Sequence, residues 1–247
     1  IYDKPLIFYP LSILMLSGIR DILIIVNKGQ LSQFKKIIPN GNNLGIKISY
    51  IEQNYPKGLP DAFRIGKNFI KDSSVALILG DNFFYGESLT KKLKTLVKLN
   101  TGATVILHPV KNPSSYGVAK INKKNKILKI VEKPKKFFSN LAITGLYFFD
   151  NKVVNFSKEL KPSKRKEVEI VDLLNKYKKN KKLKAEFLGR GGVWLDTGSI
   201  KDFYSTSSFV SNLENSLFVG FSIFIWLTGL VGIFLPNIDF CKACAQI

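Results

Sequence analysis

The sequence is poor in the residues that build metal and disulfide frameworks. Its 247 residues include two cysteines, Cys241 and Cys244, and one histidine, His108. A zinc scaffold or a disulfide framework needs more such side chains, so both are excluded, and a cytoplasmic location is expected. His108 lies within an apolar run, which favours a core or sheet-surface position over a catalytic one.

Arginine is almost as scarce, although the chain is strongly basic. There are 38 Lys+Arg against 18 Asp+Glu, a net charge of +20. The arginines are Arg20, Arg64, Arg165 and Arg190. Because guanidinium is the usual group for reading nucleic-acid phosphates and bases, this composition argues against a nucleic-acid partner. Dispersed lysines favour small anionic substrates equally well.

One long apolar run stands near the C-terminus. Residues 217–235 contain 19 residues without a charge, which meets the ~18-residue threshold for a membrane span. Three explanations stay open: a membrane anchor, a shifted reading frame or misassembled end, and an apolar buried helix. The flanking charges are too balanced for the positive-inside rule to orient a span.

The rest of the chain alternates between helical and strand patterns. Helices are expected at 5–18, 30–38, 59–70 and 89–99, and strands at 21–26, 46–51, 75–79 and 103–110. From Gly117 the pattern becomes richer in strands, at 118–121, 127–131, 143–149, 183–188 and 193–196, with a helix at 167–177. This order predicts an α/β fold with a mostly parallel sheet, helices on both faces and a β-rich extension. Ligands are then expected beyond the carboxyl ends of the strands.

Two aspartates stand where predicted strands end. Asp81 follows the strand at 75–79, and Asp196 ends the strand at 193–196 and precedes a Thr-Gly turn. A single aspartate at such a place is often only a turn former. Two that converge on one crevice can hold Mg²⁺ against substrate phosphates.

Other polar positions are weaker signals. Glu132 and Lys133 lie side by side before Pro134, where a surface ion pair is the simpler interpretation. Arg165 precedes a helix and could reach a phosphate, or lie in a solvated loop. Gly58 opens a helix, whose free N–H groups favour an anion or a nucleobase carbonyl.

Taken together, these motifs resemble the sugar-nucleotide pyrophosphorylases, and most specifically the glucose-1-phosphate thymidylyltransferases. The resemblance covers about residues 1–212. It is carried by Ile1–Pro5, Gly18–Ile24, Leu79–Gly86, Tyr116–Val118, Glu132–Pro134, Thr144–Phe148 and Trp194–Gly198. We therefore expect a nucleotidyltransferase domain at 1–212 and an atypical apolar segment at 213–247.

The resemblance implies a Rossmann-like fold that joins dTTP to α-D-glucose 1-phosphate with Mg²⁺. The products are dTDP-glucose and pyrophosphate, for dTDP-sugar and cell-surface polysaccharide biosynthesis. It implies that Asp81 and Asp196 bind Mg²⁺, and that Lys133 and Arg165 hold the sugar phosphate. The remaining implied contacts are Gln53 and Gly58 to thymine, and Tyr116, Gly117, Glu132, Lys133, Ile143, Gly145 and Trp194 around the sugar.

The sequence also departs from the family. The family's glycine-rich N-terminal strand and loop would precede Ile1, and that strand is expected at the middle of the sheet. The family's Asp-Gly-Leu-Ala-Gln-Ala is Lys57–Ala62 here, and the polar tail that forms subunit contacts is replaced, which argues against the family's homo-oligomer. The alternative function is therefore an inactive truncated remnant that only binds nucleotide sugars, possibly attached to a membrane through 217–235. A glycosyltransferase is disfavoured because it expects Asp-x-Asp at a strand end.

Overall fold

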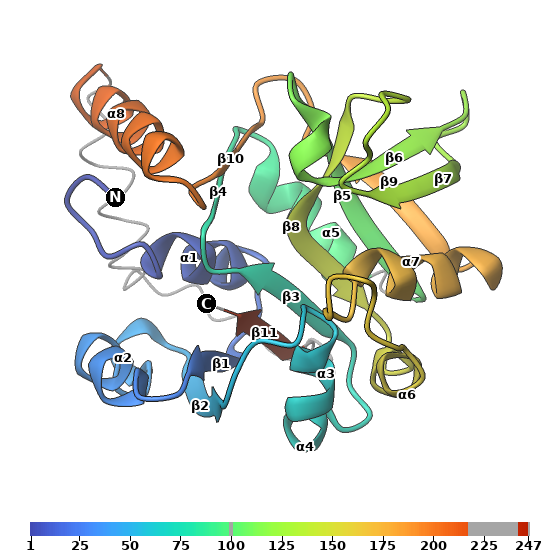
Figure 1. Ribbon diagram of the computed structural model, residues 1–247. Coiled ribbons are helices and arrows are strands. Elements are labelled where there is room, and N and C mark those ends of the chain that lie inside the picture. The colour runs from blue at the N-terminus through green and yellow to red at the C-terminus, as the bar shows by residue number, and fades with distance from the viewer. Residues whose placement is uncertain (99–100, 217–241, 247) are drawn as a thin grey trace.

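The computed structural model describes residues 1–98, 101–216 and 242–246, and it contains one large sheet (Figure 1). The main path of the sheet runs β2-β1-β11-β3-β8-β5-β9, with β6 paired to β8 and β7 to β6. Its strands are β1 (Asp21–Asn27), β2 (Lys47–Gln53), β3 (Val75–Leu79), β5 (Ala103–Pro109), β6 (Gly117–Ile121), β7 (Ile127–Glu132), β8 (Leu141–Phe149), β9 (Leu183–Phe187) and β11 (Lys242–Gln246). A separate two-stranded sheet joins β4 (Asn82–Tyr85) to β10 (Val193–Asp196).

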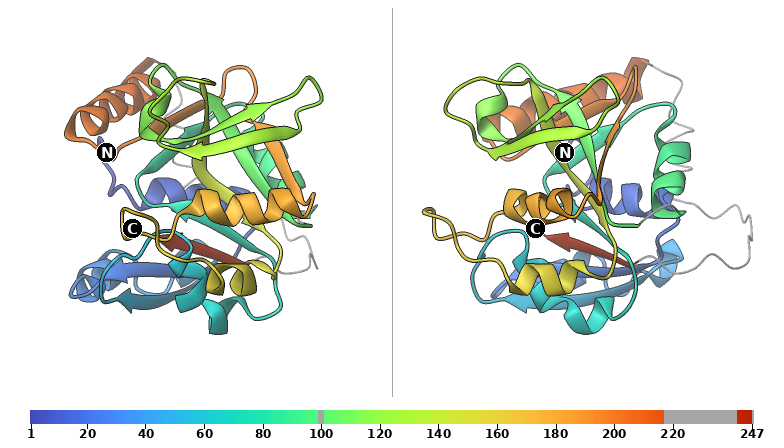
Figure 2. Two further views of the ribbon diagram at one scale, coloured as in Figure 1. Left: turned by 45° about the vertical axis from the view of Figure 1, so that its right-hand side comes forward. Right: turned by 90° about the vertical axis from the view of Figure 1, so that its right-hand side faces the viewer.

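The predicted α/β class is confirmed, and parallel pairs predominate along the main path. β2–β1, β1–β11, β11–β3 and β5–β9 are parallel, whereas β8 is antiparallel to both β3 and β5. The hairpin of β6 and β7 and its pairing with β8 form the predicted β-rich extension. The extension and α8 (Ile200–Ser216) lie at the end of the molecule away from α4 (Lys67–Ile70) (Figures 1 and 2).

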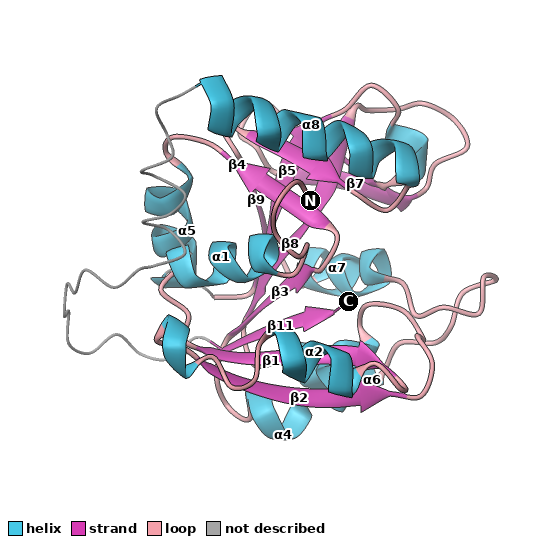
Figure 3. Ribbon diagram, turned by 90° about the vertical axis from the view of Figure 1, so that its left-hand side faces the viewer, coloured by secondary structure: helices cyan, strands magenta, loops and turns pink. Residues whose placement is uncertain are grey.

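Helices cover both faces of the sheet because its strands are apolar on both sides. In β1, Ile22 and Ile24 pack into one hydrophobic core, and Leu23 and Ile25 into the other. α1 (Phe8–Leu16) and α5 (Leu89–Lys98) lie next to each other (Figure 3), and their buried apolar residues belong to the first core. Those of α3 (Asp61–Ile65), α4, α6 (Val153–Lys158) and α7 (Ile170–Lys179) belong to the second, while α2 (Leu31–Ile37) has no buried residue. Continuous apolar runs of this kind are typical of strands buried on both faces.

The middle of the sheet differs from the sequence expectation. The strand expected there was one preceding Ile1, yet the position between β1 and β3 is taken by β11, from the opposite end of the chain (Figure 1). Cys244 is in register with Leu23 of β1 and with Leu77 of β3. β11 thereby gives hydrogen-bond partners to two strands that do not pair with each other, and buried backbone groups need such partners.

One helical prediction also differs in detail. The helix expected at 59–70 is two short helices, α3 and α4, separated at Gly66. α8 extends from Ile200 to Ser216, past the predicted domain limit at 212, and Lys4 forms an ion pair with its Glu214 (Nζ–Oε1 3.1 Å). The apolar run at 217–235 lies outside the described residues. Among the helices in the described ranges, none has the length and apolar character needed to cross a membrane.

Candidate functional site

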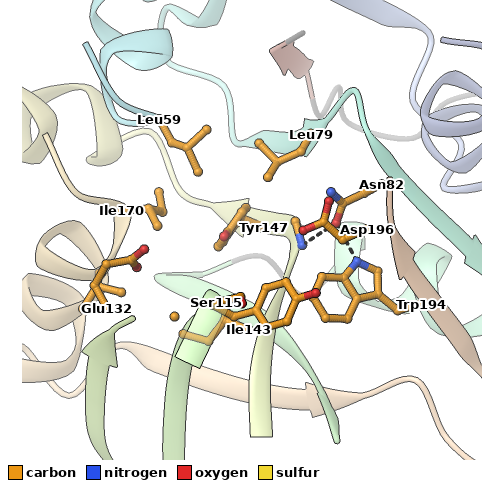
Figure 4. A pocket seen from close by; sticks show the side chains of 14 residues that line it. Leu59, Leu79, Asn82, Ser115, Glu132, Ile143, Tyr147, Ile170, Trp194 and Asp196 are labelled. Carbon is orange, nitrogen blue, oxygen red and sulfur yellow. Dashed lines mark hydrogen bonds between the residues drawn. The ribbon is translucent and has the colours of Figure 1, made fainter. Parts of the chain in front are cut away.

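A cavity of about 150 Å³, lined by both apolar and polar residues, lies beyond β3 and against β8 (Figure 4). It is lined by Leu59, Leu79, Asn82, Ser115, Tyr116, Gly117, Glu132, Ile143, Gly145, Tyr147, Ile170, Val171, Trp194 and Asp196. Seven of the predicted site residues are in this set: Tyr116, Gly117, Glu132, Ile143, Gly145, Trp194 and Asp196. The cavity therefore collects residues from six strands, β3, β4, β6, β7, β8 and β10.

The two predicted metal-binding aspartates face one another across Gly198. A Cβ atom built on Gly198 would lie 3.1 Å from Asp196 Oδ1 and 3.5 Å from Asp81 Oδ2. The arrangement is held by Thr197, whose backbone N–H (2.9 Å) and hydroxyl (2.8 Å) both donate to the carbonyl oxygen of Asp81. The turn after β10 is thereby fixed to the turn after β3, which brings the two carboxylates together.

This pair is electrostatically unfavourable without a cation. Burial raises the pKa of Asp196, the Gly198 N–H opposes that rise, and the negative charge of Asp81 adds to it. Carboxylate oxygens are the ligands that Mg²⁺ prefers, and Mg²⁺ needs only one or two of them beside substrate phosphates. In the described part of the chain, no three His, Cys, Asp or Glu side chains gather into a metal cluster. The pair fits a metal whose remaining ligands are water and phosphate.

Glu132 lines the cavity, whereas its exposed neighbour Lys133 does not and acts on the site through its charge. Glu132, at the end of β7, lines the cavity, and burial raises its pKa, with a further rise from the charge of Glu169. Lys133 is exposed and has a left-handed backbone (φ +42°), with its N–H donating to the carbonyl of Tyr116 (2.9 Å). Neighbours in a strand alternate sides, so this turn is what allows the positive charge of Lys133 to act on Glu132 as well as on Asp196.

Arg165 lies at the rim of the cavity and is already engaged by carboxylates. Its Nε and Nη2 donate to both oxygens of Glu169 (3.0 and 2.6 Å), and its Nη2 is 3.5 Å from Oε1 of Glu132. The Ser163 hydroxyl also donates to Glu169 (2.6 Å). Burial opposes ionisation of Glu169, but these hydrogen bonds outweigh it and lower its pKa. Arg165 is thus held in place, and it does not line the cavity itself.

The two residues predicted to contact the base do not line the cavity. Gln53 is buried at the end of β2, where its amide donates to Asn27 Oδ1 (3.1 Å). Gly58 has φ +104°, and a Cβ there would lie 2.2 Å from the carbonyl oxygen of Val168. The neighbouring Leu59 does line the cavity. Gly58 therefore packs the 57–58 segment against the start of α7 instead of facing this cavity.

An aromatic wall closes one side of the cavity. Trp194 stands edge-on to Tyr116 (ring centroids 5.1 Å apart) and to His108 (6.2 Å). Burial lowers the pKa of His108, which suits a neutral ring in a packing position, as expected from the sequence. Trp194 belongs to β10, so this wall also includes the part of β10 that lines the cavity.

Several cavity residues were not predicted as site residues. The most informative is Asn82, the buried first residue of β4. Leu79 and Tyr147 have a signal in the sequence, because each belongs to a strand motif that carries the family resemblance. Ser115, Ile170 and Val171 have no comparable signal, since only the fold brings them to the cavity.

Comparison with known proteins identifies the family of this chain. The family model for nucleotidyl transferases matches residues 1–212. The chain belongs to the nucleotidyl transferase family. It is 47% identical over 215 residues to the glucose-1-phosphate thymidylyltransferase of Neisseria meningitidis, with 87% of this chain and 75% of that protein covered. It is 43% identical to the Mycobacterium tuberculosis protein of the same name, with 87% and 74% covered. The family predicted from the sequence motifs is confirmed.

Solved structures of this family have the same fold. A Bacillus anthracis structure described as a glucose-1-phosphate thymidylyltransferase with a sucrose superposes with a TM-score of 0.76 at 32% identity, covering 84% of this chain and 83% of that one. A UDP-glucose pyrophosphorylase complexed with UDP-glucose superposes with a TM-score of 0.73 at 25% identity, covering 85% and 88%. The Rossmann-like nucleotidyltransferase fold is confirmed.

Proposed function

We propose that this nucleotidyl transferase joins dTTP to α-D-glucose 1-phosphate. An oxygen of the sugar phosphate attacks the α-phosphorus of dTTP, and the bond between the α- and β-phosphates breaks, so that dTDP-glucose and pyrophosphate are formed. The observation that carries the proposal is the pair of carboxylates, Asp81 and Asp196, facing each other beside a cavity that also contains Glu132. Relatives up to 47% identical are named for this reaction.

Charge neutralisation is the main task of such a site, because little covalent chemistry falls to the protein in phosphoryl transfer. Mg²⁺ held by Asp81 and Asp196 would supply part of this neutralisation, by stabilising the negative charge on the nucleotide phosphates. Lys133 and Arg165 supply the rest by binding the sugar phosphate at the rim. Since Glu169 occupies one side of the Arg165 guanidinium, the phosphate must approach the other side.

The sugar occupies the cavity between Glu132 and the aromatic wall. Glu132 accepts hydrogen bonds from sugar hydroxyls, and Gly117 leaves room for them, because a Cβ there would come within 3.2 Å of Glu132 Oε2. Tyr116, Ile143, Gly145 and Trp194 complete the enclosure. A hexose ring that stacks its apolar face on such a wall, with its hydroxyls toward a carboxylate, is oriented for in-line attack.

The base is proposed to lie beyond Leu59, toward Gly58 and Gln53. The catalytic unit in this proposal is residues 1–212, and residues 213–247 are an additional segment whose β11 joins the same sheet. The product would serve dTDP-sugar and polysaccharide biosynthesis in the cytoplasm.

The test is release of pyrophosphate from dTTP and glucose 1-phosphate with Mg²⁺, with dTDP-glucose identified by mass. Asp196→Asn should lower the rate by about 10²-fold or more, because it removes charge from the metal site. Asp72→Asn is the matched control, since Asp72 precedes β3 at the end opposite Asp81 and is exposed. Its rate should equal that of the wild type.

Three results would change the proposal. Equal rates in wild type and Asp196→Asn would remove the metal site from the mechanism. Binding of dTDP-glucose by the folded chain without any turnover would instead support the alternative, an inactive protein that binds nucleotide sugars. Faster turnover with UTP than with dTTP would reassign the base.

A further inference from the structure

Asn82 joins three separate parts of the site through one buried side chain. It is 1% exposed and begins β4. Its amide oxygen accepts from the backbone N–H of Gly145 (3.0 Å) in β8 and from the indole Nε1 of Trp194 (2.5 Å) in β10. Its amide nitrogen donates to Asp81 Oδ1 (2.7 Å). Figure 4 shows Asn82, Asp196 and Trp194 on the same wall of the cavity.

The orientation of this amide follows from the chemistry of its partners. A backbone N–H and an indole N–H can only donate, so the atom between them must be the oxygen of Asn82. The nitrogen is then directed at the carboxylate of Asp81, which can only accept. The neutral N–H groups of Gly145 and Trp194 therefore determine that the amide N–H of Asn82 points at the carboxylate of Asp81.

Gly145 is shaped for this contact. A Cβ atom at position 145 would lie 2.4 Å from Oδ1 and 2.7 Å from Cγ of Asn82. Only a residue without a side chain allows the backbone of β8 to approach the amide so closely. The close approach and the three hydrogen bonds form one assembly, which we call the Asn82 node (Asp81, Asn82, Gly145 and Trp194).

We propose that Asn82 is a positioning residue that holds the Asp81 carboxylate in its metal-binding orientation. This inference rests on the proposed function, in which Asp81 and Asp196 bind Mg²⁺. The hydrogen bond ties down Oδ1 of Asp81, while Oδ2 is the oxygen that lies toward Gly198. Partners of this kind behind a metal ligand fix its orientation, and their loss typically weakens metal affinity or activity by about 10–100-fold.

The first measurement is Mn²⁺ binding to the full chain, followed by the loss of the free-ion signal in electron paramagnetic resonance. Asn82→Ala should raise the Mn²⁺ dissociation constant by about 10–100-fold. Trp194→Phe keeps an aromatic ring and removes one donor, so it should give a smaller rise. Asn151→Ala is the control, because Asn151 is exposed and donates to a backbone carbonyl outside the site (3.2 Å to the oxygen of Asp72).

The second measurement needs no metal and follows the indole N–H proton of Trp194 by nuclear magnetic resonance. The signal that disappears in Trp194→Phe identifies it. Asn82→Ala should move this signal upfield through loss of its acceptor. Asp81→Ala should also move it, because the amide of Asn82 loses the group that its nitrogen binds. A structural role of Asn82 confined to β4 would leave the indole signal unmoved in Asp81→Ala.

The outcomes separate this inference from the proposed function. A folded Asn82→Ala with wild-type Mn²⁺ affinity, beside a weakened Asp81→Ala, would overturn the positioning role. Wild-type Mn²⁺ affinity in Asp81→Ala would overturn the metal assignment of the proposed function instead. In that case the indole signal decides: movement in Asp81→Ala supports the connection through Asn82, and no movement overturns it. Should Asn82→Ala fail to fold, Trp194→Phe and Asp81→Ala carry the same test.

Discussion

The two halves of the site are held in different ways. The inner half, Asp81, Asn82 and Asp196, is fixed by hydrogen bonds among buried or half-buried groups in, or next to, β4, β8 and β10. The outer half, Lys133 and Arg165, carries the positive charge and is exposed. Arg165 is held there by ion pairs with Glu132, Glu167 and Glu169.

The two halves therefore differ in what fixes the positions of their side chains. In the inner half the sheet imposes the geometry, so two like charges are kept close although their repulsion is unfavourable. In the outer half, oppositely charged side chains form ion pairs at the surface, where such pairs contribute little to stability and are weakened by salt. Damage to the sheet should therefore disrupt the geometry of the inner half. Surface substitutions should change only the substrate affinity of the outer half.

The strongest test of this contrast is a break in the middle of the sheet. Cys244→Pro removes a backbone donor in β11, which pairs with β1 and β3 at once, and a buried group left unpaired costs about 1–3 kcal/mol in addition to the steric cost of the ring. We expect loss of cooperative thermal unfolding by circular dichroism. Ala185→Pro in β9, which ends the main path of the sheet, is the control and should be milder. Equal melting temperatures for Cys244→Pro and wild type would show that β11 does not support the sheet.

Gly145→Ala should be next in effect. The new methyl would meet Asn82 Oδ1 at 2.4 Å and Leu79 Cδ1 at 2.9 Å, and overpacking of this kind costs about 1–3 kcal/mol. Pyrophosphate release should fall more steeply than the melting temperature, because the Asn82 node is displaced. Gly189→Ala, where a Cβ meets nothing within 4 Å but φ is +94°, separates backbone strain from the clash. An equal loss of activity in both variants would contradict this explanation.

Removal of the outer cation tests the second half directly. Lys133→Met keeps a long side chain and removes the charge proposed to bind the sugar phosphate. We expect a rise of about 10-fold or more in KM for glucose 1-phosphate, comparable to the loss of one charged hydrogen bond. The KM for dTTP and the melting temperature should change little. Lys129→Met in β7, the strand that Lys133 follows, is the control, and a matching rise there would point to a general effect of charge.

Glu169→Gln should have a smaller effect that depends on pH. The pKa of Glu169 is lower in the folded protein than in the unfolded chain, so its stabilising contribution is fully present above the unfolded value of about 4.5 and is lost as pH falls through the folded value. The melting temperatures of wild type and Glu169→Gln should therefore differ at pH 7 and converge in acid. A difference that grows toward low pH would contradict the sign of this linkage.

Glu132→Gln should give the smallest effect on stability, and in the opposite direction. The pKa of Glu132 is raised in the folded protein, so its ionised form costs stability once pH exceeds the unfolded value of about 4.5. At pH 7 the variant should melt at a higher temperature than wild type, while its affinity for glucose 1-phosphate falls. A lower melting temperature would show that the contact with Arg165 outweighs the burial.

Much of this protein is determined by local sequence. The apolar runs of β1 and β3 are long enough and uniform enough to predict buried strands within a residue or two of their observed ends. Asp81 and Asp196, each at the end of a predicted strand, predict a shared carboxylate site, although Asp196 reaches Asp81 through β10, which pairs antiparallel with β4 in a separate sheet. The motifs around them identify the family.

Other features were decided by tertiary structure alone. No local pattern shows that residues 242–246 enter the sheet between β1 and β3, because a five-residue strand is defined by its partners. Nor does the sequence reveal that Asn82 connects Asp81 to Gly145 and Trp194, since those contacts span 63 and 112 positions of the chain. Local patterns determine which segments are apolar and where strands end. The packing of distant strands determines which polar atoms meet, because hydrogen bonds between them form only at distances that the whole fold imposes.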